Sequence, residues 1–581
     1  MGKVEHRHLC GFVRVSVIVL AVLCLGVGGC SRNYHRKAAD HEAAQVIAAK
    51  APSVRNMDPH FTIEQATNSI IDALPVVQQT NDFFGVEAAA EVGARMISLE
   101  KALEIAVSKS RTYQTRKEQL FLQALDLTLA RHRYTPIFSG GAHATYETQA
   151  KDVEREIESI VGGEVVRQTA LVLEQQHKVG GGANAGMNLL LATGGRLAAD
   201  FSVDFLRFMT GDSRWATSSR LGATLTQPLL RGAGFKVALE NLTQSERNLL
   251  YALREFTRFR KDFSVDVASR YYQVLQGRDE VLNAWIGLEN FRKNVERERA
   301  FVQEGRRTEA ELGRLQQAEL NTKGQWVDAI RNYRERLDLF KILLGLPADA
   351  RIVLSEQELD KLKIVHPDVV IEDAIKVALE TRLDLYNQRD QFEDEARRID
   401  LAANGLKPDL NLILRGDVGS KPGLRPQALD FDRAKWSAGL DLNLPLDRKS
   451  ERNTYRRSLI DYERSKRDLQ LAVDQIKLDV NEGWRALDQA KLNHEIAAIG
   501  VTLSQRRVEE QELRIAVGRE GTTVLDLIDA RRDQINARNQ RTRAVVGHTI
   551  ARLQFWRDVG ILYIKENGQW DETQNVVNVA K

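Results

Sequence analysis

The chain contains an internal repeat, because two of its segments align without a gap at a shift of 272 residues. Residues 99–106 (LEKALEIA) align with residues 371–378 (IEDAIKVA), and the same shift brings Pro136 onto Pro408. Self-similarity of this kind indicates two related substructures within one chain. We therefore expect function to depend on the assembled pair of repeats, and not on one local motif.

Composition and charge narrow the possible functions. The 581 residues include 83 basic and 80 acidic side chains, so a net charge of +3 gives no support to a nucleic-acid partner. No histidine–glutamate pair has the spacing of metal ligands, and no motif resembles a catalytic nucleophile. We expect no enzymatic activity, no bound metal and no cofactor.

The first thirty residues have the features of a lipoprotein export signal. A basic stretch ending at Arg14 precedes an apolar run over residues 15–27 that is too short to span a bilayer comfortably. The run leads into Gly28, Gly29 and Cys30, which resemble a bacterial lipoprotein processing site, and no aspartate follows, which indicates passage to the outer membrane. The other two cysteines lie inside the segment that would be cleaved, so Cys30 would have no disulfide partner in the mature chain. Acylation is therefore the role that we expect for its thiol. The alternative is an ordinary signal peptide with an incidental cysteine.

Beyond the repeated prolines, the hydrophobic period changes from helical to alternating. Apolar residues occupy every second position over residues 221–225, 410–414 and 440–444. Because proline cannot continue a helix, we expect helix–strand junctions at Pro136, Pro228, Pro408 and Pro445. Strands with one apolar and one polar face fit either a transmembrane barrel or a soluble sandwich with one wet face. The export signal favours the barrel.

Each repeat thus supplies two strands, which makes four per chain. Four strands cannot close a barrel of useful bore, and open strand edges are not tolerated in hydrocarbon. A membrane barrel therefore requires several chains. Three protomers would supply twelve strands, an even number that can close.

The first repeat carries an insertion of about 55 residues between its two strands, within residues 147–214. Residues 153–176 predict a charged helix, residues 180–183 (GGGA) are glycine-rich, and residues 193–195 (TGG) predict a hairpin turn. We expect the insertion at the outer mouth of the barrel or alongside it. The glycines do not fit a phosphate-binding loop, because no Lys-Ser/Thr pair follows them.

A very long helical hairpin follows the second strand of each repeat. In the first repeat, helices are expected over residues 239–301 and 309–344, with a break near Gly305. The second repeat has the same plan over residues 453–515 and 523–556. At about 1.5 Å per residue, the longest run reaches roughly 95 Å. Abundant charge and intermittent apolar positions favour coiled-coil packing with a hydrated face.

Three features, taken in order along the chain, carry a resemblance to a known family. They are the paired helix–proline–strand units, residues 226–232 (TQPLLRG) and residues 517–530 (VGREGTTVLDLIDA). Together with the lipoprotein signal, they make residues 97–562 resemble the TolC family of outer-membrane efflux and secretion channels. The resemblance implies a mainly α-helical fold with a small β part. Three protomers would form a twelve-stranded β-barrel continuous with an α-helical tunnel across the periplasm.

The resemblance also implies a function and partners. The chain would be the passive conduit of a tripartite efflux or type I secretion system, localised in the outer membrane. Its partners would be two further copies of itself in a homotrimer, outer-membrane lipid, a periplasmic adaptor, and an inner-membrane pump that supplies the energy. The alternative is a lipid-anchored coiled-coil scaffold of the cell envelope without a pore.

The helical breaks would form the periplasmic tips of such a channel. The residues expected to dock the adaptor are Gly305, Arg306, Thr308, Gly518, Gly521, Thr522 and Leu525. Asp526 and Asp529 match positions that ring the tunnel constriction, and threefold symmetry would multiply them into stacked acidic rings. The alternative is that both carboxylates complement the N-terminus of the following helix, stabilising it by about 0.3–1 kcal/mol each.

These segments imply a domain organisation. A signal peptide would occupy residues 1–29, and a lipid-anchored extended tether with a short helix near 62–74 would follow over residues 30–96. The first repeat would span residues 97–345 and the second repeat residues 371–562, with a connection over residues 346–370 between them. A C-terminal tail would span residues 563–581.

Overall fold

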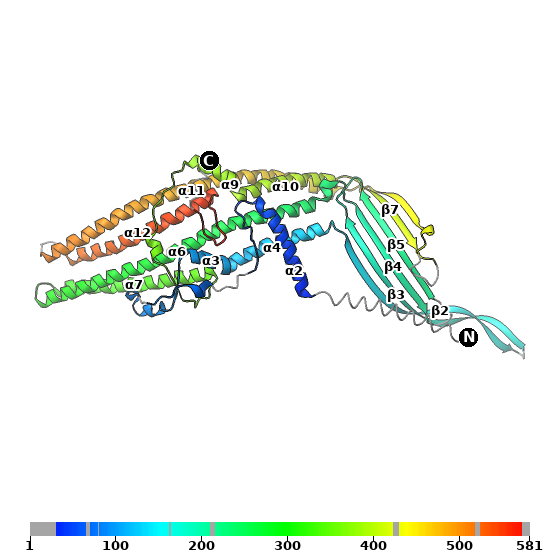
Figure 1. Cartoon of the computed structure of the whole chain (residues 1–581), viewed down its shortest axis with the longest axis horizontal. Coiled ribbons are helices and arrows are strands. Elements are labelled where there is room, and N and C mark those ends of the chain that lie inside the picture. Colours follow the sequence, from blue (N-terminus) through cyan, green and yellow to red (C-terminus); the bar gives the residue numbers. More distant parts are fainter. Residues whose placement is uncertain are drawn as a thin grey trace. The chain divides into compact units, whose positions relative to one another are not determined.

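The computed structural model describes residues 31–64, 70–78, 81–161, 164–209, 215–421, 429–517 and 523–571. Cys30 and three expected tip residues, Gly518, Gly521 and Thr522, lie outside these ranges. The chain forms two compact units: Met1–Ala124, Leu249–Asp390 and Arg467–Lys581 make up the first, and Leu125–Asn248 and Gln391–Lys466 the second. The first unit is mainly helical, and the second contains the main β-sheet with the helix segments that adjoin it (Figure 1).

The internal repeat is visible in the helices that open each half. α3 (Leu99–Lys109) and α9 (Ile371–Thr381) both contain 11 residues, and their ends differ by the shift of 272 residues. The next helices, α4 (Arg111–His132) and α10 (Leu383–Gly405), also begin at this shift. Buried alanines occupy equivalent positions in the two short helices: Ala102 and Ala106 in α3, Ala374 and Ala378 in α9. The same sequence pattern therefore builds the same helix twice.

Long helices follow in each half, as expected. α6 (Glu240–Gln303) precedes α7 (Glu309–Leu344), and α11 (Lys449–Ala516) precedes α12 (Val524–Val559). At about 1.5 Å per residue, α6 extends over roughly 96 Å and α11 over roughly 102 Å.

The second helix of each hairpin is bounded by the same local signals. α7 and α12 both contain 36 residues, and Thr308 and Thr523 begin them with capping boxes. Gly345 and Gly560 follow their last turns with φ values of 78° and 87°. Glycine adopts this left-handed conformation without a steric penalty, which is why it so often ends a helix.

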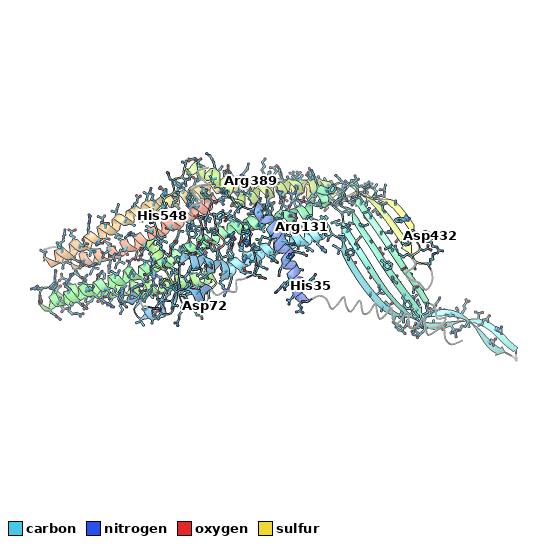
Figure 2. The ribbon with its side chains drawn as sticks, viewed as in Figure 1. His35, Asp72, Arg131, Arg389, Asp432 and His548 are labelled. Atoms are coloured by element: carbon cyan, nitrogen blue, oxygen red, sulfur yellow. The ribbon has the colours of Figure 1, made fainter. Side chains whose placement is uncertain are left out.

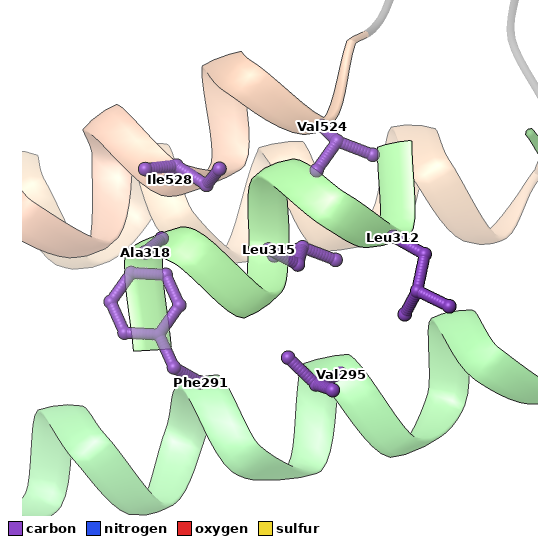
Figure 3. Packing of buried hydrophobic residues seen from close by; sticks show 7 residues of the cluster. All are labelled: Phe291, Val295, Leu312, Leu315, Ala318, Val524 and Ile528. Carbon is purple, nitrogen blue, oxygen red and sulfur yellow. The ribbon is translucent and has the colours of Figure 1, made fainter. Parts of the chain in front are cut away.

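Buried apolar side chains join three of the long helices in the first unit (Figure 3). The cluster consists of Phe291 and Val295 from α6, Leu312, Leu315 and Ala318 from α7, and Val524 and Ile528 from α12. Packing of the first turns of α12 on the first hairpin follows from this cluster. It positions the segment that carries Asp526 and Asp529.

The second unit contains an antiparallel sheet of six strands among its described residues, in the order β2–β3–β4–β5–β7–β8. The strands are β2 (Ile137–Val161), β3 (Glu164–Leu190), β4 (Arg196–Phe208), β5 (Trp215–Pro228), β7 (Asp409–Gly419) and β8 (Lys435–Asn443). β2 and β3 extend well beyond the other strands (Figure 1).

The sheet has six strands where four were expected. β2, β5, β7 and β8 are the expected strands, and β3 and β4 come from the insertion. Residues 153–161 and 164–176 form strand and not the expected charged helix, so that prediction was wrong. Their charges pair across strands: Arg155 contacts Glu174 at 3.3 Å, and Arg167 contacts Glu158 at 2.8 Å. Charge pairs across a hairpin leave no mark on a local hydrophobic period.

The N-terminal region is folded where an extended tether was expected. It begins with α2 (Arg32–Lys50), whose Ala43, Val46 and Ile47 are buried. Farther along, Trp326 Nε1 donates a hydrogen bond to the carbonyl oxygen of Phe83 at 2.8 Å. Arg278 forms a buried ion pair with Glu91 at 2.5 Å. These contacts hold the segment against the helices of the first unit.

Shorter elements complete the described chain. β1 (Arg95–Ile97) pairs in parallel with β6 (Ile352–Leu354) in the first unit. The remaining helical segments are α5 (Phe235–Ala238), α8 (Gln357–Asp360) and the 3₁₀ segments Ala51–Ser53, Ile70–Ala73, Asp82–Ala90 and Phe431–Arg433. Residues 65–69 of the short helix expected near 62–74 lie outside the described ranges. Among the helices described, none has the length and apolarity needed to cross a membrane.

Candidate functional site

The six-stranded sheet has one apolar and one polar face across all of its strands. Alternate residues of a strand point to opposite faces, and the pairing register carries each face from one strand to the next. The apolar face includes Phe138, Met187, Phe201, Leu225, Leu412 and Leu440, one from each strand. The opposite face includes Ser139, Asn184, Asp200, Thr224, Arg415 and Asp441.

The apolar face is exposed in the single chain. Phe138 is 77% exposed, Trp436 81% and Leu440 68%. A soluble monomer seldom exposes so many large apolar side chains on one continuous face. Such a face instead matches the lipid-facing side of a transmembrane barrel strand.

The polar face carries charged groups at close quarters. A side chain at Gly182 would meet His143 Cε1 at 2.5 Å and Asp204 Oδ1 at 2.6 Å, so both side chains already lie over this glycine. Nearby strands are joined on the same face by an ion pair between Arg220 and Asp417 at 2.5 Å. A sheet face that carries charges of both signs is suited to contact with water.

The four prolines expected at helix–strand junctions lie between helices and strands. Pro136 lies between α4 and β2, Pro228 is the last residue of β5, Pro408 lies between α10 and β7, and Pro445 lies between β8 and α11. Side chains bind the backbone around these junctions. The Tyr134 hydroxyl donates to the carbonyl of Ala238 at 2.6 Å, and Gly232 N donates to Asn404 Oδ1 at 2.8 Å.

The turn between β3 and β4 lies at residues 191–195, where the hairpin turn was expected. Leu191 N donates to the carbonyl oxygen of Gly195 at 2.7 Å. Gly194 has a φ of +90°, and a Cβ there would lie 2.5 Å from the carbonyl oxygen of Gly232. Only glycine fits so close an approach of two backbones.

The segment TQPLLRG (residues 226–232) holds this turn. Gln227 Nε2 donates to the carbonyl of Thr193 at 3.3 Å, and Thr193 Oγ1 donates to Gln227 Oε1 at 2.9 Å. Gly234 N donates to the same carbonyl at 3.1 Å. The most distinctive motif after the strand therefore binds the inserted hairpin.

The tip of the first hairpin ends α6 in a Schellman motif. Gly305 has a φ of +69°, its N–H donates to the carbonyl of Val302 at 2.9 Å, and Arg306 N donates to the carbonyl of Phe301 at 2.9 Å. The guanidinium of Arg306, 70% exposed, pairs with Glu304 at 3.2 Å. This tip presents its charges to solvent.

The start of α12 gives Asp526 a capping role. Its carboxylate accepts hydrogen bonds from Thr523 N at 2.9 Å and Thr523 Oγ1 at 2.8 Å. The backbone hydrogen bond, followed by that of the hydroxyl, lowers the pKa of Asp526. Val524 and Ile528 are buried, whereas Leu525 is 44% exposed and Asp529 is exposed. Asp526 therefore has the helix-capping role that was the alternative, and its carboxylate stays ionised.

Sequence reasoning missed β3 and β4 as strands of the sheet, although β4 carried a signal. Leu197, Ala199, Phe201, Val203 and Phe205 alternate with more polar residues directly after the turn glycines. This alternation spans about the length of a transmembrane strand. In the described part of the chain, no cluster of His, Cys, Asp and Glu side chains has the arrangement of a metal site.

Comparisons with known proteins identify the fold. Neither protein-family models nor curated proteins gave a match. Among solved structures, the chain is similar to the CmeC outer membrane channel of Campylobacter jejuni, with a TM-score of 0.57, 13% identity, and coverage of 90% of this chain and 98% of that one. It is also similar to VceC of Vibrio cholerae (TM-score 0.56, 13% identity, 80% and 96% covered) and to the MtrE outer membrane channel of Neisseria gonorrhoeae (0.53, 15%, 80% and 90%). The chain therefore has the fold of these outer-membrane channels, as the resemblance to the TolC family implied.

Proposed function

We propose that this protein is the outer-membrane channel of a tripartite efflux or type I secretion system. Three chains would join their sheets into one barrel, and their long helical hairpins would line a periplasmic passage. The observation that carries this proposal is the six-stranded sheet, with a continuous exposed apolar face and a polar opposite face. A sheet with these two faces is suited to separate lipid from water. Because its two edges are open, further copies of the chain are required to close it into a barrel.

The conduit would be passive, and its partners would provide energy and selectivity. The sequence contains no nucleotide-binding motif, so an inner-membrane pump must drive transport. A periplasmic adaptor would dock at the tips through Gly305, Arg306, Thr308 and Leu525. Gly518, Gly521 and Thr522, which lie outside the described residues, are proposed to take part as well. Exposed charge at Arg306 and exposed apolar surface at Leu525 support different adaptor contacts at the two tips.

A constriction at the tips would be formed by Asp526 and Asp529. Three protomers would bring six carboxylates together, and rings of carboxylates favour cations in a narrow pore. Because capping holds Asp526 ionised, one ring would keep its charge under mildly acidic conditions.

An acylated Cys30 would anchor the mature chain to the outer membrane. The export signal and the lack of other cysteines in the mature sequence support this role. The lipid anchor would attach the chain to the membrane in addition to the barrel.

Reconstitution tests the channel against a poreless envelope scaffold. We expect heat-modifiable, detergent-resistant trimers in the outer-membrane fraction that form channels in planar bilayers. A monomer that high salt releases from the membrane, without channel activity, would support the scaffold instead.

A further inference from the structure

We propose that the inserted strands β3 and β4 are part of the transmembrane wall, so that three chains close a barrel of eighteen strands and not twelve. This inference rests on the proposed channel function and deepens it. It names the partner of each sheet edge as a second copy of this chain. Four independent features of the second unit lead to it.

The first feature is the facing pattern of the inserted strands. Phe201 pairs with Ala185 on β3 and with Leu221 on β5, so the apolar face continues through the insertion without interruption. The neighbouring Ser202 pairs with Asn184 and Arg220 on the polar face. Strands lying in water outside the membrane would have no reason to keep one face apolar.

The second feature is the position of the β3–β4 turn. This turn is five residues long, and it is bound by Gln227 and Gly234 at the point where β5 leads toward α6. The hairpin therefore returns at the helix-proximal end of the sheet. Short turns at the periplasmic end are typical of outer-membrane barrels.

The third feature is the stagger of the sheet. One hydrogen-bonded row runs from Ile137, the first residue of β2, to Ser437, six residues before the end of β8 at Asn443. The row crosses five inter-strand spacings, about 24 Å, while six residues span about 20 Å. Ile137 and Asn443 both adjoin helices at the same end of the sheet. When these two residues are placed at the same height along the barrel axis, the strands tilt by about 40° from that axis. This tilt is within the range of closed transmembrane barrels.

The fourth feature is the pair of open edges. Within the described sheet, β2 pairs only with β3 and β8 only with β7. β2 leads away from a helix and β8 leads toward one, so β2 of one copy is antiparallel to β8 of the next. Each copy thus provides both edges of the interface between neighbouring sheets, and head-to-tail contacts of this kind can close into a ring.

Eighteen strands would widen the pore considerably. With spacings of about 4.8 Å and a tilt of about 40°, the backbone diameter is about 36 Å, against about 24 Å for twelve strands. Barrels of sixteen to eighteen strands leave an aqueous channel. The insertion would therefore enlarge the membrane pore, and the helical passage below it would set the limit on flow.

Site-directed spin labelling of the reconstituted trimer tests which strands face lipid. All three natural cysteines lie within the first thirty residues, so a background with Cys10→Ala, Cys24→Ala and Cys30→Ala leaves no competing thiol, whether or not the signal is cleaved. Phe201→Cys and Ser202→Cys report on the two faces of β4, and Leu414→Cys and Arg415→Cys report on β7. Accessibility to oxygen, which partitions into lipid, is compared with accessibility to a water-soluble nickel chelate. If the β4 variants do not assemble, Val203→Cys and Asp204→Cys replace them on the same faces.

The outcomes separate this inference from the proposed function. We expect the ratio of oxygen to nickel accessibility to reverse between adjacent residues on both strands. A reversal on β7 with water exposure at both β4 positions would overturn the inference and leave the channel function intact. No reversal on β7 would overturn both. A cryo-electron microscopy map of the trimer in lipid nanodiscs provides a direct count, with eighteen strands expected and twelve contradicting the proposal.

Discussion

Asp526 combines a structural and a proposed electrostatic role in one side chain. Its carboxylate completes the capping box of α12 with Thr523. Hydrogen bonds to the ionised form lower its pKa below the usual value. The stabilisation it provides is therefore present at neutral pH and is lost only as the pH falls through that lowered pKa. The same charge remains available to a cation at the tip.

The proposed acidic constriction predicts a change in cation block. Replacing both Asp526 and Asp529 with asparagine should weaken block by multivalent cations and alter the resting conductance in planar bilayers, because the pore loses six negative charges per trimer. Thr523→Ala is the matched control. It removes the cap, at a cost of about 1 kcal/mol, and keeps both carboxylates. Equal block in the double variant and the unmodified channel would contradict the acidic rings.

His548 lies on α12 in the first unit, where Figure 2 labels it. It is fully buried, and neither ring nitrogen has a hydrogen-bond partner among the described residues. Burial lowers its pKa to about 4, and electrostatic interactions with Arg552, His366, His494 and Lys491 act in the same direction. The folded protein therefore holds this ring neutral.

Loss of stability in mild acid follows from this histidine. Below about pH 6.5, His548 binds a proton in the unfolded chain but not in the folded chain. The free energy of unfolding should therefore fall between pH 6.5 and 4, by on the order of 1–3 kcal/mol. His548→Leu should make the thermal midpoint less dependent on pH across this window. His60→Phe, at an exposed position, should leave the dependence unchanged. An unaltered slope in His548→Leu would show that the ring does not titrate as described.

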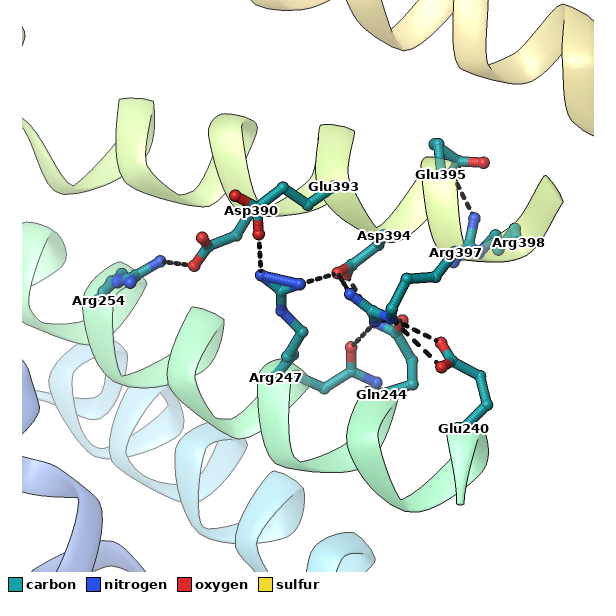
Figure 4. A network of polar contacts seen from close by, with 11 residues as sticks. Glu240, Gln244, Arg247, Arg254, Asp390, Glu393, Asp394, Glu395, Arg397 and Arg398 are labelled. Atoms are coloured by element: carbon teal, nitrogen blue, oxygen red, sulfur yellow. Dashed lines mark hydrogen bonds and ion pairs between the residues drawn. The ribbon is translucent and has the colours of Figure 1, made fainter. Parts of the chain in front are cut away.

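At the scale of elements, an ion-pair network joins α6 to α10 within the second unit (Figure 4). Arg247 contacts Glu393 at 2.7 Å and Asp394 at 2.8 Å, and Arg397 contacts Asp394 at 2.8 Å and Glu240 at 3.2 Å. The side chain of Asp394 is only 3% exposed. It is the shared acceptor of two arginines.

Removing Asp394 should be costly, because both arginines would lose their buried partner. Asp394→Ala should lower the free energy of unfolding by about 3 kcal/mol, the lower end of the cost of breaking a buried ion pair. Glu393→Ala is the matched control, since Glu393 contacts the same arginine but is 66% exposed and should cost less than about 1 kcal/mol. Denaturant unfolding measures both. Equal losses in the two variants would show that burial does not set the difference.

The outer part of the β2–β3 hairpin is a ribbon of two strands. β4 pairs with β3 only from Lys178 onward, whereas β2 and β3 continue to pair as far as Val161 and Glu164. At about 3.3 Å per residue, the ribbon extends roughly 45 Å beyond the sheet. Leu171 and Leu173 are 70% and 69% exposed on it.

The ribbon should be dispensable for assembly. Replacing residues 150–175 with Asn-Gly joins Gln149 to its partner Gln176 through a tight turn. We expect detergent-resistant trimers and unchanged conductance, because the deleted residues pair only with one another. Gly194→Ala, in the β3–β4 turn, should instead reduce trimer yield, because a Cβ there would lie 2.5 Å from the carbonyl oxygen of Gly232. Loss of trimers in the shortened chain would mean that the ribbon itself takes part in assembly.

At the scale of the whole molecule, the lipid anchor can be tested separately from the barrel. Cys30→Ala should abolish incorporation of labelled palmitate, because the variant lacks the cysteine at which the predicted signal would be processed and acylated. Cys24→Ala, within the signal, should leave the label in place. Continued labelling of the Cys30 variant would refute acylation at this position.

Much of the helical architecture was predictable from the sequence. The 272-residue shift places α3 and α9, the prolines mark the changes of element, and Thr308 and Thr523 begin the second helices of the hairpins. Each of these signals is local. A helix period, a cap or a proline acts through neighbours within about one turn, so its effect does not depend on the rest of the fold.

The composition of the sheet was decided by tertiary structure. Residues 153–176 were expected to be helical, yet residues 153–161 pair with residues 164–172 across a hairpin, and residues 173–176 pair with β2 as well. β4 lies between β3 and β5. Alternation can mark a segment as a strand, but which strands pair, and in what register, depends on contacts between segments that the local sequence does not specify. The sequence by itself determined a duplicated helix–strand–hairpin chain with strands that alternate between apolar and polar residues. Only the pairing of the strands decided that six of them, and not four, build the sheet.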